Sequence, residues 1–203
     1  GAETAAIRKV ASQTNSEHTG VLIHARDALQ RQMETTRARG FRLEVHAIGD
    51  AAAESVLDCM LAAGVSEQER PVLTHCQVLG QDLYKKMSAL GCIANVQPSF
   101  VPTDAAWVQA RLSAAHIEFS YAWKTLLYSP GITVAGGSDA PIETPAPLVG
   151  IYDAIHRTPR DEGGSVFRPE ECLGFAEALW TYTVGGAFSC GSEHIFGRLE
   201  AGY

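Results

Sequence analysis

The feature that most constrains the fold is a regular alternation of short apolar segments with longer segments of helical length. Four apolar segments of strand length occupy residues 41–48, 72–76, 92–97 and 132–137. Strands that alternate with helices form parallel sheets, because each connection must cross back over the sheet before the next strand begins. The sequence therefore predicts an α/β fold with a parallel sheet, which is either open and doubly wound or part of a barrel.

The helix-length segments are bounded by residues that commonly start or stop helices. Gly40, Gly64 and Gly91 each follow such a segment, where a left-handed residue can end a helix. Asp50 is predicted to cap the helix that follows it. The predicted helices cover residues 23–39, 51–63, 82–90, 104–127 with a break near Ser113, 148–156 and 169–189.

Polar side chains lie at the end of each predicted strand. His46 is near the end of the first, His75 and Gln97 end the second and third, and Asp139 follows the fourth. In parallel α/β folds the carboxyl ends of the strands open on one face, and the chemistry gathers there. The repetition in four consecutive strand–helix units favours a barrel over an open sheet.

His46, His75 and Asp139 form a candidate metal site. Imidazole nitrogen and carboxylate oxygen are ligands that Zn²⁺ takes, and a catalytic site keeps one position open for water. Each residue alone has an alternative role, as a structural histidine or as the cap of the turn before Pro141. Their shared position in three units is what predicts the site. The other histidines are expected at the surface or in packing: His18, His24, His116, His156 and His194.

Composition excludes several classes of protein. The 203 residues, 46% of them hydrophobic, suit one globular domain, and the net charge of −7 leaves no basic surface for nucleic acid. No apolar run reaches the ~18 residues of a membrane helix, and no signal peptide is recognisable. The five cysteines form no Cys-x-x-Cys pair, which predicts free thiols and a cytoplasmic location. Cys76 is expected to be a buried thiol rather than a nucleophile.

Two glycine-rich stretches do not fit the motifs that they resemble. Residues 136–140 read Gly-Gly-Ser-Asp-Ala, one position short of the Gly-x-Ser-x-Gly elbow of serine hydrolases, and no suitable acid and histidine follow in order. Gly185 and Gly186 lie inside a predicted helix with no strand before them, so they do not form a dinucleotide-binding loop.

Several motifs together resemble the amidohydrolase superfamily. They are VHAIGDAA, THCQ, NVQPSF with Asp104 and Trp107, YAWKTLL, and GSDAPIETPAPLVGIYDAIHR. The resemblance is to amidohydrolase family 3, which includes enzymes similar to N-substituted formamide deformylase. It implies a partial (β/α)8 TIM-type barrel, with strands five to eight and their helices. It also implies that residues 1–203 are the C-terminal part of a metal-dependent amidohydrolase barrel domain, truncated at both ends.

The resemblance also implies roles for single residues. His46 and His75 match metal-binding histidines, and Asp139 matches an aspartate that holds a metal and acts as the catalytic base. Residues on or near the same face are expected to contact substrate, with a purely structural role as the alternative for each of them: Gln97, Asp104, Trp107 and Arg157.

The expected activity is metal-dependent hydrolysis of a carbon–nitrogen (non-peptide) bond in a small amide, formamide or cyclic amide. One or two divalent ions, expected to be zinc, would serve the complete protein. The His-x-His motif of the family's first strand does not occur in this sequence. We therefore expect a fragment without its N-terminal metal ligands, inactive by itself, that pairs with the missing half of the barrel or self-associates. The alternatives are an inactive amidohydrolase-like fragment or binding module, and a deaminase with a single metal.

Overall fold

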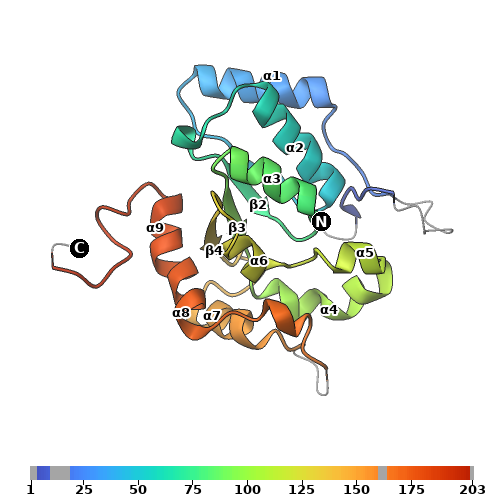
Figure 1. The fold of residues 1–203 in the computed structure, drawn as a ribbon, viewed down its shortest axis with the longest axis vertical. Helices are drawn as coiled ribbons and strands as arrows, with labels where there is room; N and C mark the ends of the chain where they lie inside the picture. The colour runs from blue at the N-terminus through green and yellow to red at the C-terminus, as the bar shows by residue number, and fades with distance from the viewer. Residues whose placement is uncertain (1–3, 10–18, 160–163, 202–203) are drawn as a thin grey trace.

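A computed structural model describes residues 4–9, 19–159 and 164–201 of the chain (Figure 1). The expected alternation of strands and helices is confirmed. In chain order the elements are α1 (Arg26–Ala38), β1 (Glu44–Ala47), α2 (Asp50–Ala62), η2 (Glu67–Glu69), β2 (Val72–His75), α3 (Gln81–Ala89), β3 (Ile93–Val96), α4 (Phe100–Arg111), α5 (Ala114–Ile117), α6 (Trp123–Leu127), β4 (Thr133–Gly136), α7 (Pro147–His156), η3 (Pro169–Glu171), α8 (Phe175–Trp180), η4 (Thr181–Gly185) and α9 (Gly186–Ser189).

The four strands form one parallel sheet in the order β1-β2-β3-β4. Their carboxyl ends are aligned, since Ala47 pairs with His75 and Val96 pairs with Gly136. A doubly wound sheet reverses its strand order at a switch point, whereas a barrel adds each strand on the same side of the one before. The sheet is therefore built as a segment of a (β/α) barrel.

One face of the sheet carries the hydrophobic core. Leu73, Ala94 and Val134 are fully buried on it, and they belong to the same cluster as Leu57 and Met60 of α2. Figure 1 shows α2, α3 and α6 over this face. Removing this apolar surface from water is the main force that holds the helices to the sheet.

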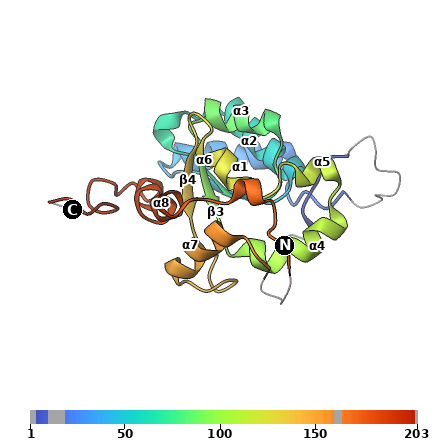
Figure 2. The ribbon, with the colours of Figure 1, turned by 60° about the horizontal axis from the view of Figure 1, so that its bottom comes forward.

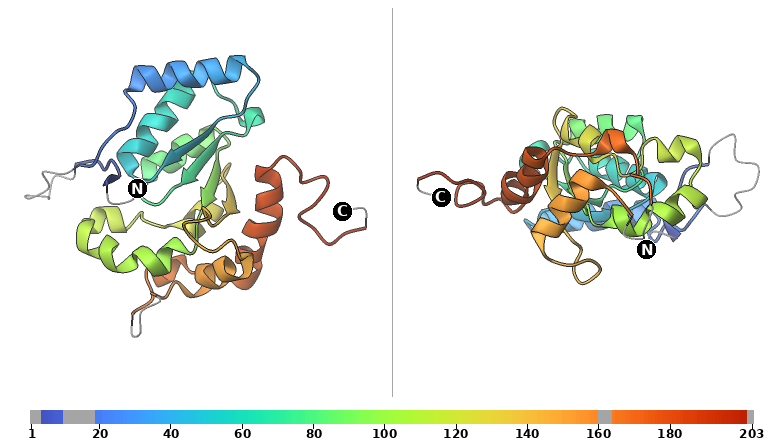
Figure 3. Two further views of the ribbon diagram at one scale, coloured as in Figure 1. Left: turned by 180° about the vertical axis from the view of Figure 1, so that it is seen from behind. Right: turned by 90° about the horizontal axis from the view of Figure 1, so that it is seen from below.

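The opposite face of the sheet is polar and partly open to solvent. Glu44 is exposed, and its Oε1 accepts hydrogen bonds from Thr74 Oγ1 at 3.0 Å and from Asn95 Nδ2 at 3.3 Å. Seen from behind, β1 and β2 run across the view with no helix in front of them (Figure 3, left). In a closed barrel this face would be the interior, which is packed with side chains.

The C-terminal helices pack beside the last strand. α7 and α8 contact each other there (Figure 2) through a small cluster of buried apolar side chains, Ile151, Ala154, Leu173 and Ala178. Phe188 of α9 reaches the open face and packs against Val72 and Ile93. The guanidinium carbon of Arg70 lies 4.1 Å from the centroid of the Phe188 ring, and Arg70 pairs with Glu193 at 2.5 Å. These contacts hold α9 and the residues after it against one end of the open face.

The structure corrects the predicted helix over residues 169–189. The chain forms the short turn η3 and then a separate helix that begins at Phe175. The interruption has a local cause, because the amide of Leu173 donates to Ala154 O at 3.1 Å and that of Gly174 donates to Glu177 Oε2 at 2.6 Å. Those bonds replace the ones that a continuous helix would make.

Two further helix predictions need adjustment. The predicted break near Ser113 is confirmed, but a second break follows Ile117, where Tyr121 has a φ of 48° and its amide donates to Gln77 O at 2.6 Å. Asp50 does not cap α2. The amides of the following two residues donate instead to Ala6 O, at 3.2 and 3.4 Å, and Asp50 Oδ1 accepts from the amide of Arg8 at 2.8 Å.

Candidate active site

A cavity of about 390 Å³ lies at the carboxyl ends of the strands. Residues from β1, β2, α4 and the loop after β4 contribute to its walls: His46, Ile48, His75, Gln77, Phe100, Thr103, Asp104, Asp139, Ile142 and Glu143. His46, His75, Asp104 and Asp139 were predicted from the sequence as site residues, and the structure brings them to this one cavity.

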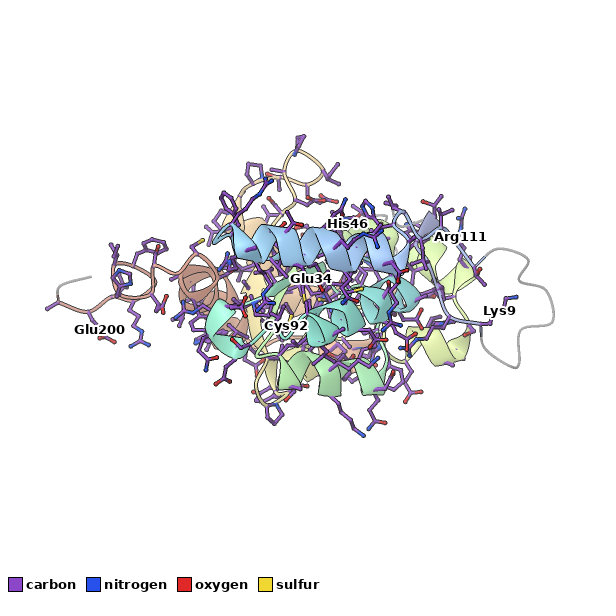
Figure 4. All side chains as sticks on the ribbon, turned by 90° about the horizontal axis from the view of Figure 1, so that it is seen from above. Lys9, Glu34, His46, Cys92, Arg111 and Glu200 are labelled. Atoms are coloured by element: carbon purple, nitrogen blue, oxygen red, sulfur yellow. The ribbon has the colours of Figure 1, made fainter. Side chains whose placement is uncertain are left out.

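His46 and His75 lie side by side on adjacent strands. Their ring centroids are 4.4 Å apart and the rings are inclined at 78°. The partial burial of His46 lowers its pKa, the neighbouring His75 lowers it further, and the carboxylate of Asp139 opposes both effects. These effects favour the neutral imidazole of His46, the form that binds metal ions. Figure 4 shows His46 beside α1, with which it also shares a second cavity of about 570 Å³.

Gln97 fixes the orientation of the His75 ring. Its Oε1 lies 2.8 Å from His75 Nδ1, while its Nε2 donates to Asn95 Oδ1 at 3.2 Å. Because the amide nitrogen is engaged by Asn95, the oxygen faces His75, and Nδ1 carries the proton. The lone pair of His75 is then on Nε2. Gln97 acts through His75 and does not line the cavity, which differs from its predicted contact with substrate.

The backbone is strained at two of the strand ends that form the cavity. His75 has a φ of 86°, Cys76 of 52° and Asp139 of 54°, all in the left-handed region. Such conformations are uncommon for residues other than glycine and cluster at functional sites. The turn after β2 also places Gln77 in the cavity wall.

Cys76 is a buried thiol, as expected from the sequence. Its side chain is 1% exposed and donates to Leu73 O at 3.3 Å. Burial raises the pKa of the thiol well above its ordinary value, which leaves it protonated and unreactive. All five cysteines are free.

Asp104 is held by three neutral hydrogen-bond donors. Its Oδ1 accepts from Trp107 Nε1 at 3.0 Å, and its Oδ2 accepts from Tyr121 Oη at 2.8 Å and from Gln77 Nε2 at 3.3 Å. Burial nevertheless raises the pKa of this carboxyl group, against the effect of the three bonds. Trp107, predicted as a substrate contact, binds Asp104 and does not line the cavity.

Arg157 lies inside the protein and away from the cavity. Its side chain is fully buried, Nε donates to Phe167 O at 2.9 Å, and Nη2 donates to Tyr121 O at 3.0 Å. The guanidinium lies 5.3 Å from the ring of Trp123, and burial lowers its pKa to about 10. These contacts give Arg157 a structural role, which was the alternative to its predicted contact with substrate.

The donors present suit a divalent metal but form only part of a site. Two adjacent imidazoles, one neutral and one held in a single tautomer, are good ligands for zinc, and the carboxylate of Asp139 lines the same cavity. Within residues 4–9, 19–159 and 164–201, no three His, Cys, Asp or Glu side chains are grouped closely enough to hold an ion.

The other described histidines, His24, His116, His156 and His194, do not line the cavity. His116 is buried, with its Nδ1 2.9 Å from Ser113 Oγ at the start of α5. His24, His156 and His194 are exposed. His18 lies outside the described residues.

The sequence matches the amidohydrolase family (Amidohydro_3) over residues 1–203. The chain belongs to this family. It is 36% identical over 199 residues to YtcJ of Bacillus subtilis (strain 168), which is named as an amidohydrolase, and 30% identical over 167 residues to the Arabidopsis thaliana protein LONG AFTER FAR-RED 3. These matches take in 98% and 80% of the chain but only 37% and 28% of the two relatives. The chain thus spans little more than a third of the length of YtcJ and less than a third of the length of the Arabidopsis protein.

Two solved structures share the fold. A metal-dependent hydrolase from Pyrococcus horikoshii OT3 matches all of the chain with a TM-score of 0.85 and 26% identity, and one from Pyrococcus furiosus matches 93% of it with a TM-score of 0.80 and 28% identity. The chain covers 40% and 37% of those two proteins. The predicted α/β fold, a partial (β/α) barrel, is confirmed.

Gln77 and Glu143 line the cavity but were not singled out from the sequence. Gln77 lies in the THCQ motif, two residues after His75, where an extended strand would point it to the same face as that histidine. Glu143 follows Asp139 in a proline-rich loop, whose path the sequence does not specify. An acidic residue close to a predicted catalytic aspartate was the available signal.

Proposed function

We propose that this chain carries part of the active site of a metal-dependent hydrolase that cleaves a carbon–nitrogen (non-peptide) bond in a small amide, formamide or cyclic amide. The observation that carries the proposal is the pair of adjacent imidazoles, His46 and His75, in one cavity with the carboxylate of Asp139. Membership of the amidohydrolase family, and the metal-dependent hydrolases that share the fold, support it.

His46 and His75 would hold a divalent ion, expected to be zinc, with one or two ions in the complete protein. When bound, such an ion supplies Lewis acidity, which lowers the pKa of water and polarises a carbonyl group. Gln97 keeps the Nε2 lone pair of His75 available by accepting a hydrogen bond from the protonated Nδ1.

Asp139 moves the proton in the proposed reaction. Its carboxylate accepts a proton from the attacking water and returns it to the leaving nitrogen as the carbon–nitrogen bond breaks. Both steps use the same oxygen atoms, so no second acid is required. Phe100 and Ile48, which are nearly buried in the cavity wall, exclude bulk water from the reacting groups.

The proposal extends to the rest of the protein. Residues 1–203 would be the C-terminal part of the barrel domain, carrying strands five to eight, in an enzyme similar to N-substituted formamide deformylase. The other metal ligands would come from the remaining part of that barrel, or a second copy would cover the open face. A cytoplasmic location and a small-molecule substrate are part of the same proposal. None of the described helices is long and apolar enough to span a membrane.

The substitution Asp139→Asn tests the proposed base. Asparagine keeps the size of the side chain and one oxygen but cannot accept the proton, so turnover of an amide panel by the full-length protein should fall by ~10²–10⁴-fold. Metal content, measured by elemental analysis, should fall much less. The matched control is Asp27→Asn on the exposed face of α1, which should change neither value. Near-normal turnover by Asp139→Asn with full metal content would remove Asp139 from the role of base.

A second candidate is a binding module without catalytic activity. It is favoured by the observation that the described residues supply two adjacent imidazoles and no group of three ligands. Metal analysis of the full-length protein, combined with turnover on the same amide panel, separates the two candidates.

A further inference from the structure

The cavity has an acidic wall apart from the proposed catalytic groups. Besides His46, His75 and Asp139, the charged residues that line it are Asp104 and Glu143. Among the described residues, no lysine or arginine lines it. Charges of one sign in a cleft with apolar walls attract ligands of the opposite sign and repel those of the same sign.

Gln77 adds an unused hydrogen-bond acceptor to this wall. The residue is 1% exposed, its Nε2 donates to Asp104 Oδ2 at 3.3 Å, and its Oε1 has no hydrogen-bond partner among the residues that the structure describes. The opposite orientation of the amide would place an oxygen against the carboxylate, so the unpaired atom is an acceptor. A buried acceptor without a donor costs about 1–3 kcal/mol, and an N–H or O–H group of a ligand would satisfy it.

The negative charge of Asp104 is not neutralised by its neighbours in the wall. The three groups that donate to it, from Trp107, Tyr121 and Gln77, are neutral. Burial raises the pKa of this carboxyl group, against the effect of the three hydrogen bonds. A donor from a ligand, and most of all a cationic donor, would stabilise the charged form.

The rest of the cavity suits an apolar group. Ile48, Phe100 and Ile142 lie in its wall. Its volume of about 390 Å³ falls in the range of roughly 300–1,000 Å³ that is typical of small-molecule sites. Beside Gln77 and Asp104 the wall therefore offers apolar side chains, which suits an amide substrate with an apolar body.

We propose that Gln77 and Asp104 form a subsite for a hydrogen-bond donor, which selects substrates with a neutral amide or an ammonium group on an apolar body and excludes substrates with a carboxylate there. This inference rests on the proposed function, because it describes the part of an amide substrate away from the bond that is cleaved. Gln77 and Asp104 act as specificity residues and take no part in bond breaking.

Direct binding of three matched probes to the full-length protein tests the subsite. Phenylacetamide, benzylamine and phenylacetate share an aromatic body and differ in the group that the subsite would read. Titrations followed by NMR or calorimetry should be run with a chelator, so that no metal attracts the carboxylate. We expect phenylacetamide and benzylamine to bind at least about tenfold more tightly than phenylacetate, a difference of ~1.4 kcal/mol.

Two substitutions identify the groups responsible. Asp104→Asn should remove most of the preference for benzylamine, and Gln77→Leu should weaken phenylacetamide more than phenylacetate. The matched controls are Glu118→Gln and Gln109→Leu, at exposed positions outside the cavity, which should leave all three affinities unchanged. Circular dichroism and the unfolding midpoint of each variant show that it is folded. If Gln77→Leu fails to fold, the benzylamine preference of Asp104→Asn decides the question.

Three results overturn the subsite: phenylacetate binds as tightly as the other two probes, none of the three probes binds, or the preference survives Asp104→Asn. These outcomes are separate from the proposed reaction. If the preference is found and the full-length protein hydrolyses no amide, the subsite stands and the proposed function falls. If the full-length protein hydrolyses carboxylate-bearing amides equally well, the subsite alone falls.

Discussion

Gln97 controls which nitrogen of His75 can serve as a ligand. Without the oxygen 2.8 Å from Nδ1, the proton could move to Nε2 and the ring could rotate. Groups that orient a metal-binding histidine typically contribute 10–100-fold to metal affinity or activity. Gln97→Leu should therefore lower the affinity of the full-length protein for zinc by about 10–100-fold, measured by competition with a chelator.

The matched control for Gln97→Leu is Gln109→Leu on the exposed side of α4, which changes the same groups away from the cavity. Its zinc affinity should equal that of the unmodified protein. An unchanged affinity in Gln97→Leu would show that His75 does not bind the metal through the tautomer that Gln97 selects.

Asp104 should make folding less favourable at neutral pH than in acid. Its pKa in the folded state is raised above the ordinary value of 3.8. At pH values between the ordinary pKa and the folded-state pKa, the native state therefore binds more protons than the unfolded state. By linkage, the contribution of Asp104 to the free energy of unfolding falls as pH rises through this window and then stays constant. Asp104→Asn removes that titration. Relative to the unmodified protein, the variant should gain stability as pH rises from about 4, and the difference should stay constant once Asp104 is ionised in the native state.

Urea unfolding of both proteins at several pH values measures this difference. Glu118→Gln is the control, because Glu118 is an exposed carboxylate, and it should show no comparable trend. A difference between Asp104→Asn and the unmodified protein that shrinks or reverses as pH rises would contradict the argument.

Some residues of the site could be predicted from the sequence because their positions follow from strand ends alone. His46, His75 and Asp139 lie at the ends of three parallel strands, and aligned strand ends meet on one face. Arg157 could not be placed this way. It follows α7 with a φ of 49°, which turns the chain so that its guanidinium reaches backbone carbonyls in the core. That turn depends on contacts between distant segments, which a local pattern does not contain.

At the scale of elements, the π-helical turn η4 packs backbone to backbone against β4. A Cβ atom at Gly185 would lie 2.1 Å from Val134 O and 3.1 Å from the ring of Trp180. Gly185→Ala should therefore destabilise the protein by about 1–3 kcal/mol, as overpacked positions do. The gain in helix propensity from alanine, about 1 kcal/mol, offsets only part of this. The urea midpoint provides the measurement.

The next residue offers the control for Gly185. A Cβ atom at Gly186 would lie 3.7 Å from Thr181 O, an ordinary contact, and Gly186 has helical angles. Gly186→Ala should leave the stability unchanged or raise it slightly. Equal effects of the two substitutions would show that close packing at β4 is not what requires glycine at position 185.

The elements that the sequence predicted best are those whose pattern is local. The four strands and the helices α2 and α7 appear within two or three residues of their expected bounds, because periodicity and stop signals lie within each segment. The expected helix over residues 169–189 failed because its interruption depends on Ala154 O, a backbone acceptor from another helix. Tertiary contacts of this kind override the propensity of the local sequence.

For the whole molecule, the strand order agrees with the predicted barrel and leaves two strands at the edges of the sheet. The sequence favoured this architecture through the repeated position of polar residues, and the unreversed order of the strands confirms it. Only four strands could be identified in the sequence, whereas a complete barrel of this type has eight, so one face of the sheet was expected to lack its opposite wall. Its hydrogen-bonded polar groups, Glu44, Thr74 and Asn95, were not predicted as a set.

The edge at β1 should make the isolated chain associate with itself. Ile23 and Phe41, which flank α1 and β1, are 81% and 66% exposed. Next to them lies the cavity of about 570 Å³ between α1 and β1, which Leu22, Ile23 and His46 help to line. Edge strands with exposed apolar side chains pair readily with other chains, and each buried apolar side chain contributes about 1.5–3 kcal/mol.

Sedimentation velocity at micromolar concentrations should accordingly show dimers or larger species of the 203-residue chain. The double substitution Ile23→Lys and Phe41→Lys should shift the chain towards the monomer, because charge at an edge opposes pairing. Leu148→Lys is the matched control: this leucine is 74% exposed but lies on α7, away from β1, so its substitution should leave the association unchanged. A chain that is monomeric and unfolds cooperatively at every concentration would show that the edge at β1 and the open face are stable in water without a partner.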